Sequence, residues 1–227
     1  MTCVTNDRSQ KREEVMTEQA RTFLPAAGKD CLLPFYDPVV KLLGGDAARQ
    51  TLVEQADLRA GQRLLEVGCG TGTLMLMIKR EHKTVEVVGI DPDPKALKRA
   101  RDKAAQAGLS VQFDQGFGDQ LPYPDESFDR VLSSFMFHHL LKEEKAKFLT
   151  QVRRVLKSSG SFHLLDFEET GKHGWFAHLV HAHHRLEDNT RERVITLMRE
   201  AGLQDAEWLS GRRRPFGRVA YYRAVRG

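Results

Sequence analysis

The stretch LLEVGCGTGTL, residues 64–74, decides the fold of this chain. A short apolar run leads into three glycines that alternate within five positions, and Glu66 stands two residues before the first of them. Glycines at a strand-to-helix turn let the backbone come close to a ligand. Such turns often hold a phosphate. An acid at the mouth of this turn would repel an anion, so the stretch favours a ligand that is positively charged there.

Short apolar runs alternate with helical segments on both sides of this turn. The expected strands are 63–68, 85–91, 111–116, 128–135 and 161–167, and the expected helices are 73–82, 94–108, 142–157, 172–187 and 189–201. This alternation predicts βαβ units, hence an α/β, doubly wound, mostly parallel sheet with helices on both faces. The final runs, 205–212 and 217–226, are joined by a short Pro-Phe-Gly turn, which predicts an antiparallel hairpin.

Composition limits the classes of protein that remain. The 227 residues, 41% apolar and 29% charged, suit one soluble domain with a full core. No run of 18 apolar residues could span a membrane, and the polar N-terminus lacks the apolar core of a signal peptide, so we expect a cytoplasmic protein. The three cysteines, Cys3, Cys31 and Cys69, have no CxxC spacing, which argues against a disulfide framework and a structural zinc site.

The charge is mildly basic and unevenly distributed. The net charge is +4, and residues 212–226 contain six arginines and no acid. A solvated edge hairpin accounts for such a run, and an acidic substrate, a membrane surface or RNA would also fit it.

A second acid defines another part of the ligand. Asp91 ends the expected strand VEVVGID, nineteen residues after Gly72. An acid at the end of the second strand can accept hydrogen bonds from ribose hydroxyls. A ligand with a ribose, and with positive charge where a dinucleotide has phosphate, is S-adenosylmethionine, whose methionine part has an ammonium and a sulfonium.

Several motifs together resemble those of the class I S-adenosylmethionine-dependent methyltransferases. They are LLEVGCGTGTL, VVGIDPDPKALKRAR, GFGDQLPYPDESFDRVLSSFMFHHL and RRVLKSSGSFHLLDF, in this order within residues 63–167. Within that class the chain is most similar to the group of ubiquinone/menaquinone-biosynthesis C-methyltransferases and small-molecule methyltransferases. The resemblance implies a Rossmann-like seven-stranded sheet and a small-molecule methyl acceptor, with S-adenosylhomocysteine as the cofactor product.

The resemblance also assigns roles to residues of this chain. Around the methionine part it implies Glu66, Gly68, Cys69, Gly70, Gly72 and Ser134. Around the ribose and adenine it implies Asp91, Pro92, Gly118, Asp119 and Gln120, with Asp119 as the acid that receives the adenine amino group. Loop capping is the alternative role for Asp91 and Asp119, and for Ser134 a structural role is equally open.

Methyl transfer to carbon or oxygen also requires removal of a proton. Four candidates for this catalytic role lie past expected strand ends or in an N-terminal lid: His138, His139, Asp166 and Tyr36. Packing or capping at a helix start is the alternative for the two histidines, and a half-buried aromatic is the alternative for Tyr36.

The expected domain organisation is simple. Residues 1–57 would form an N-terminal helical lid or extension, and residues 58–227 a single methyltransferase domain with a helical substrate lid inserted at about 170–201. Five histidines lie in this insertion, between His173 and His184, but no acid or cysteine completes a recognisable zinc set, so we expect no metal.

Two other functions stay open. A methyltransferase of RNA or protein would use the arginine-rich C-terminus, although the fourth expected strand ends in SSFMFHH, not in the signature of amino-methylating relatives. A non-catalytic relative that only binds the cofactor is the other alternative, and the intact glycine and acid motifs argue against it. We therefore expect a small-molecule acceptor and no nucleic acid, with peripheral membrane contact left open and no prediction of the oligomeric state.

Overall fold

The structure is a computed structural model that describes residues 44–169, 189–214 and 217–227. Its elements, in chain order, are α3 (Gly45–Ala56), β1 (Arg63–Val67), α4 (Thr73–Glu81), β2 (Glu86–Asp91), α5 (Pro94–Gln106), β3 (Gln112–Gln115), β4 (Phe128–Ser134), η2 (Phe137–His139), α6 (Lys142–Val155), β5 (Leu156–Phe167), α8 (Arg191–Glu200), β6 (Gln204–Arg214) and β7 (Gly217–Val225). The predictions for Tyr36, for a helix at 172–187 and for the five histidines concern residues outside the described part of the chain.

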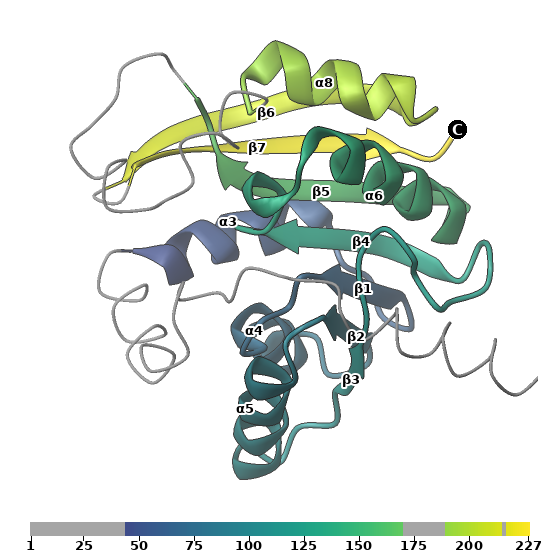
Figure 1. The fold of residues 1–227 in the computed structure, drawn as a ribbon. Coiled ribbons are helices and arrows are strands. Elements are labelled where there is room, and N and C mark those ends of the chain that lie inside the picture. Colours follow the sequence, from purple (N-terminus) through teal and green to yellow (C-terminus); the bar gives the residue numbers. More distant parts are fainter. Residues whose placement is uncertain (1–43, 170–188, 215–216) are drawn as a thin grey trace, which may run out of the picture.

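The strands form one seven-stranded sheet in the order β3-β2-β1-β4-β5-β7-β6 (Figure 1). The pairs among β3, β2, β1, β4 and β5 are parallel. β7 pairs antiparallel with both β5 and β6. The predicted doubly wound sheet with a C-terminal antiparallel hairpin is therefore confirmed. The strand order reverses at β1 and β4, which is where ligands bind in open α/β sheets.

Helices cover both faces of this sheet (Figure 1). Alternate strand residues point to opposite faces, so neighbours such as Leu64 and Leu65 enter different cores. One core joins the sheet to α3, α4 and α5, and the other joins it to α6 and α8. Because of this alternation, Glu66 lies on the same face as Leu64, toward α3, whereas Asp166 lies on the same face as Leu164, toward α6.

Local signals set the ends of the helices. α5 begins with Pro94 at its first turn, where the missing N–H costs nothing, and the side chain of Asp93 accepts a hydrogen bond from the Lys95 N–H at 2.8 Å. At the start of α6, the Glu144 carboxylate accepts a hydrogen bond from the Leu141 N–H at 2.7 Å. These caps satisfy backbone donors that have no partner inside a helix.

One predicted boundary is wrong. We expected a helix over 142–157 and a strand only from residue 161, but α6 ends at Val155 and β5 begins at Leu156. The apolar spacing of Val152, Val155 and Leu156 does not distinguish the end of a helix from the start of a strand. The pairing of Leu156 with Phe128 on β4 decides it, because that pairing buries both side chains completely.

α8 is the described part of the expected insertion at about 170–201. The buried side chains of Val194, Leu197 and Met198 pack it into the core that α8 shares with α6 and the sheet. In the part of the chain that the structure describes, no helix has the length and apolarity needed to cross a membrane.

Candidate active site

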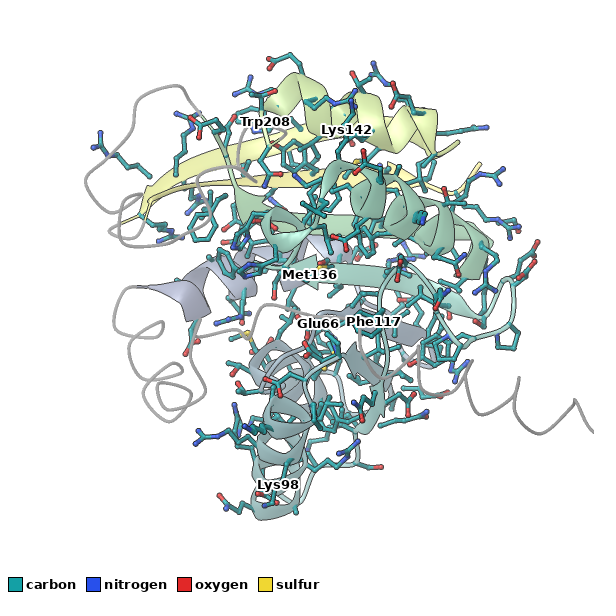
Figure 2. All side chains as sticks on the ribbon, viewed as in Figure 1. Glu66, Lys98, Phe117, Met136, Lys142 and Trp208 are labelled. Atoms are coloured by element: carbon teal, nitrogen blue, oxygen red, sulfur yellow. The ribbon has the colours of Figure 1, made fainter. Side chains whose placement is uncertain are left out.

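A cavity of about 310 Å³ opens at the carboxyl ends of β1, β2 and β4. Its walls come from the turn after β1, the end of β2, residues 116–118, residues 134–141 and the start of α6, together with one residue of α3. Figure 2 labels Glu66, Phe117 and Met136 close together at this edge of the sheet, and all three residues line the cavity. The cavity therefore lies at the switch point of the sheet.

The glycine turn has a backbone that other residues would strain. Gly68 has φ of 76° and Gly72 has φ of 73°, both in the left-handed region that glycine adopts at no steric cost. A Cβ at Gly68 would overlap the Met136 side chain, and one at Gly72 would lie 2.9 Å from the Ala100 Cβ. Gly68 and Gly70 line the cavity, whereas Gly72 supports the turn from behind.

Glu66 is a buried acid with one oxygen left without a partner. The residue is 1% exposed, and the Ser134 Oγ donates a hydrogen bond to its Oε1 at 2.8 Å. Its Oε2 is buried and has no hydrogen-bond partner. Burial raises the pKa of this carboxyl from 4.5 to about 8, although the Ser134 hydrogen bond and the Arg49 charge act in the opposite direction. A cation that enters the cavity would stabilise the ionised form of this acid, which burial otherwise disfavours.

Arg49 on α3 is a cavity residue that the sequence analysis missed. Its side chain is 8% exposed, lies 3.6 Å from the Asp46 carboxylate and is stacked 5.5 Å from the centre of the Phe135 ring. The signal was present in the sequence, because Arg49 falls on the buried stripe of its helix with Ala48, Leu52 and other apolar residues. A cation on an apolar helix face is rarely there without a partner.

Asp91, at the end of β2, is hydrogen-bonded to the glycine turn. Its Oδ2 accepts a hydrogen bond from the Gly70 N–H at 2.8 Å, and its Oδ1 accepts one from the Asp93 N–H at 2.9 Å. Burial raises the pKa of Asp91 from 3.8 to about 6, and these two N–H groups oppose that shift. The acid at the end of β2 thus ties the glycine turn to the start of α5, and Asp91, Pro92 and Asp93 all line the cavity.

His138 and Asp166 form a buried pair next to the part of the cavity wall that residues 134–141 provide. The His138 Nδ1 is 2.7 Å from the Asp166 Oδ1, and the His138 backbone N–H donates to the Asp166 Oδ2 at 3.1 Å. Burial alone would raise the pKa of Asp166, but the charge and hydrogen bond of His138 together with other nearby groups hold it below its ordinary value. The His138 ring lies 4.0 Å from the ring of His139, and His139 lines the cavity.

The structure brings most of the predicted site residues together. The cavity is lined by Glu66, Gly68, Cys69, Gly70, Asp91, Pro92, Gly118, Ser134 and His139. Outside its lining are Gly72, Asp119, Gln120, His138 and Asp166. The sequence analysis assigned no site role to the other lining residues, which are Arg49, Val67, Thr71, Thr73, Leu74, Asp93, Gly116, Phe117, Phe135, Met136, Leu140, Leu141 and Glu144.

Among the described residues, no group of three or more histidines, cysteines or acids could hold a metal ion, and the histidine-rich segment lies outside these residues. Cys69 is buried at the cavity, and burial raises the pKa of its thiol well above the ordinary value. Its sulfur therefore stays a thiol and contributes packing to the turn.

Comparison with known families identifies the class. Residues 64–160 match the family model described as a methyltransferase domain. The matched region includes β1, the glycine turn, Asp91 and the His138–His139 pair, which are the parts that build the cavity. Residues 64–160 therefore carry a methyltransferase domain, in agreement with the resemblance of the motifs to class I methyltransferases.

The curated relatives that the chain matches include methyltransferases of quinone biosynthesis. The chain is 39% identical over 139 residues to a demethylmenaquinone methyltransferase of Thermus thermophilus, an alignment that covers 60% of this chain and 62% of the relative. It is 34% identical over 169 residues to a ubiquinone/menaquinone biosynthesis C-methyltransferase of Pseudomonas fluorescens, covering 71% and 60%. It is also 38% identical over 112 residues to a 27-O-demethylrifamycin SV methyltransferase of Amycolatopsis mediterranei, covering 48% and 40%. The chain thus spans about three fifths or less of the length of these relatives.

Solved structures agree on the fold. The YcgJ protein of Bacillus subtilis is 19% identical, with a TM-score of 0.64 over 79% of this chain and 98% of that protein. A geranyl diphosphate C-methyltransferase from Streptomyces coelicolor gives a TM-score of 0.68 at 13% identity, over 81% and 79%. At these identities the likeness shows the fold alone.

Proposed function

We propose that this protein is an S-adenosylmethionine-dependent methyltransferase that methylates a small, largely apolar acceptor with an ionisable hydroxyl. The observation that carries the proposal is the unpaired Oε2 of Glu66, buried in the same cavity as Arg49 and Asp91. A dinucleotide pyrophosphate would meet the Glu66 acid at the glycine turn, so the site favours a ligand with a cation there.

The polar groups of the cavity match the parts of this cofactor. Glu66 would accept a hydrogen bond from the ammonium, and Arg49 would bind the carboxylate of the same amino-acid end. Asp91 would accept hydrogen bonds from the ribose hydroxyls, with Pro92 beside the adenine. Asp119 lies next to Gly118 of the cavity wall, and its role at the adenine amino group stays a prediction.

Methyl transfer requires the protein to align the acceptor and to remove one proton from it. When bound, the cofactor supplies a methyl group on positively charged sulfur, already activated for displacement. The chain's own residues hold the acceptor in line and exclude water, which can contribute several kcal/mol. His139 lines the cavity and would take the proton of the acceptor hydroxyl as the methyl group is transferred.

His138 and Asp166 would act through His139, as positioning residues. The Asp166 carboxylate fixes the orientation of the His138 ring through a 2.7 Å contact, and that ring lies against His139. Asp166 also accepts the backbone N–H of His138, which fixes the turn that carries both histidines. The proposed catalytic role of Tyr36, in an N-terminal lid, concerns a residue outside the described part of the chain.

The proposed acceptor follows from the remaining wall of the cavity. Phe117, Phe135, Met136, Leu140 and Leu141 make this wall largely apolar, with His139 among them. An aromatic alcohol such as a quinol or phenol combines an apolar body with a proton that can be removed. The names of the relatives, which include methyltransferases of menaquinone and ubiquinone biosynthesis, support a quinol.

The first test is calorimetric titration of the purified protein with S-adenosylmethionine, S-adenosylhomocysteine and NAD. We expect micromolar binding of the two sulfur ligands and none of NAD. Incubation with a short-chain demethylmenaquinol should then yield S-adenosylhomocysteine, while the same quinol methylated both on its ring and on its two hydroxyls serves as the control. A folded protein that binds neither sulfur ligand would refute the proposal.

A further inference from the structure

The arginines at the end of the β6–β7 hairpin are not used by the proposed reaction. Arg212, Arg213 and Arg214 end β6, and Arg218 follows at the start of β7. Arg212 and Arg213 are exposed, and no ion pair joins either of them to an acid in the described part of the chain. Arg218 pairs with Glu168, so it is partly neutralised.

The register of the sheet places these arginines beside the candidate site. Arg212 lies opposite Val219, which lies opposite Phe167, the last residue of β5. The Phe167 ring is 4.9 Å from the His138 ring and 5.5 Å from that of Phe135, a cavity residue. Arg213 and Arg214 continue past the end of β5, and Figure 1 shows the yellow hairpin strands projecting beyond it.

The distribution of charge along β6 argues against simple protection of a sheet edge. Charges on an edge strand hinder pairing with other chains wherever they occur along it. In β6 the acids Asp205 and Glu207 lie in the first half, and the arginines are gathered at the end nearest the cavity. Arg213 lies directly opposite Arg218, whose charge pairs with Glu168, so Arg212 and Arg213 keep their charges for an anion outside the chain.

We propose that the end of the β6–β7 hairpin docks on an anionic phospholipid surface, which brings the mouth of the cavity to acceptors dissolved in the lipid. Each arginine near such a surface contributes about 1 kcal/mol of attraction. Leu141 lines the cavity and is half exposed, which is unusual for a large apolar side chain among the described residues. In the proposed arrangement it would contact the lipid.

The same charges would also attract RNA, but the described residues favour lipid. Proteins that bind single strands combine a cationic groove with aromatic platforms on which bases stack. The described hairpin end is a projecting pair of strands, and its aromatic neighbours Phe167 and Trp208 are partly buried in the packing of the sheet. A projecting cationic end suits a flat anionic surface better than a strand that must be enclosed.

The test is sedimentation of the full chain with vesicles of phosphatidylcholine alone and of phosphatidylcholine mixed with phosphatidylglycerol. The variant Arg212→Gln/Arg213→Gln removes two exposed charges from the hairpin end. The matched control, Arg80→Gln/Lys83→Gln, removes two exposed charges near the end of α4, which connects β1 and β2 and is distant from the hairpin in the strand order. Circular dichroism and cofactor binding confirm that each variant is folded.

We expect the wild-type chain to bind only the anionic vesicles, and less at high salt. The hairpin variant should bind about thirtyfold more weakly, and the control variant should bind like the wild type. Equal loss in both variants, or equal binding to neutral vesicles, would overturn the proposal. The proposal would also be overturned if the wild-type chain bound a single-stranded RNA more tightly than vesicles and the hairpin variant lost that binding. The hairpin end would then be a binding surface for a nucleic acid. Cofactor titration is unaffected by either outcome, so failure here leaves the proposed reaction standing.

Discussion

Glu66 and Arg49 come from elements that are separate in the sequence and line the same cavity, with opposite charges when both are ionised. The Glu66 Oε2 is buried without a hydrogen-bond partner, and the Arg49 charge is among the influences that lower the pKa of Glu66. An amino-acid zwitterion has the two complementary charges one carbon apart. This pair of residues therefore makes the sharpest predictions about the ligand.

Arg49→Gln should weaken binding of S-adenosylmethionine by about 2 kcal/mol, the contribution of a hydrogen bond to a charged group. The variant should bind 5′-methylthioadenosine as the wild type does, because that ligand has the same nucleoside and sulfur but no amino-acid end. Titration calorimetry with both ligands gives the comparison. Equal weakening of both ligands would mean that Arg49 only supports the fold.

Glu66 should make the stability of the ligand-free protein fall as pH rises. The native state holds a proton up to about pH 8, whereas the unfolded carboxyl loses it near 4.5, so the native state binds more protons between these values. Stability then falls with rising pH across that window, by at most about 1.4 kcal/mol per pH unit. Asp91 adds the same effect only up to about pH 6. Burial lowers the pKa of His163 from 6.5 to about 3, so His163 has the opposite effect up to about pH 6.5, and the slope of Glu66 is clearest between pH 7 and 8.

Urea unfolding at several pH values measures this slope. Glu66→Gln should flatten it between pH 7 and 8, because the amide does not titrate. Binding of S-adenosylmethionine should release a proton from wild-type Glu66, which calorimetry in buffers of different ionisation enthalpy detects. The same slope in the Gln variant would show that another group titrates in that window.

Asp91→Asn should weaken both S-adenosylmethionine and 5′-methylthioadenosine, by about 1–3 kcal/mol. Both ligands have the ribose that Asp91 is proposed to hold, which distinguishes this variant from Arg49→Gln. The Asn side chain keeps one oxygen for the Gly70 or Asp93 N–H, so thermal unfolding should change less than ligand binding does. Unchanged affinity in a folded variant would contradict the placement of the ribose.

Gly68→Ala should destabilise the protein by about 1–2 kcal/mol because φ of 76° strains an L-residue. The added Cβ would also meet the Met136 side chain. Adding Met136→Ala should therefore recover part of the loss and leave the backbone strain. Denaturant unfolding of the two single variants and the double variant gives the coupling, and strict additivity would mean that the two side chains do not meet.

His139→Ala should lower kcat for a quinol acceptor by about 10²-fold or more and leave the affinity for S-adenosylmethionine unchanged. Asp166→Asn should lower kcat less and alter its pH profile, because it acts through His138. His163→Ala is a control, since His163 is a buried histidine on β5 that lies away from the cavity lining. An equal loss of kcat in all three variants would indicate a general effect on the fold.

Much of the fold could be predicted from local patterns. The alternation of strands and helices predicted the mostly parallel α/β sheet, and the short last turn predicted its antiparallel end, whereas the number of strands came from the family resemblance and their order from the structure. These signals are local because turn geometry and side-chain period depend on neighbours in the chain. The boundary between α6 and β5 was wrong because the partner of Leu156, Phe128, lies far away in sequence.

The candidate site was predicted less completely. Glu66, Asp91 and His139 were found because each follows or ends a recognisable strand. Arg49 was not found, because its place on the buried stripe of α3 does not show which part of the sheet that stripe covers. Asp166 was predicted to act in the site directly, and the structure places it behind His138 instead.

By itself the sequence determined the class of sheet, the position of its ligand-binding edge and the presence of an acid at the glycine turn. Those properties depend on residue spacing and on residues within a few positions of one another. Only the tertiary structure decided which charges share one cavity, which oxygen of Glu66 lacks a partner and where the arginines of β6 lie. Such facts depend on strand alternation and register, which place side chains distant in sequence on the same face and exclude water between them.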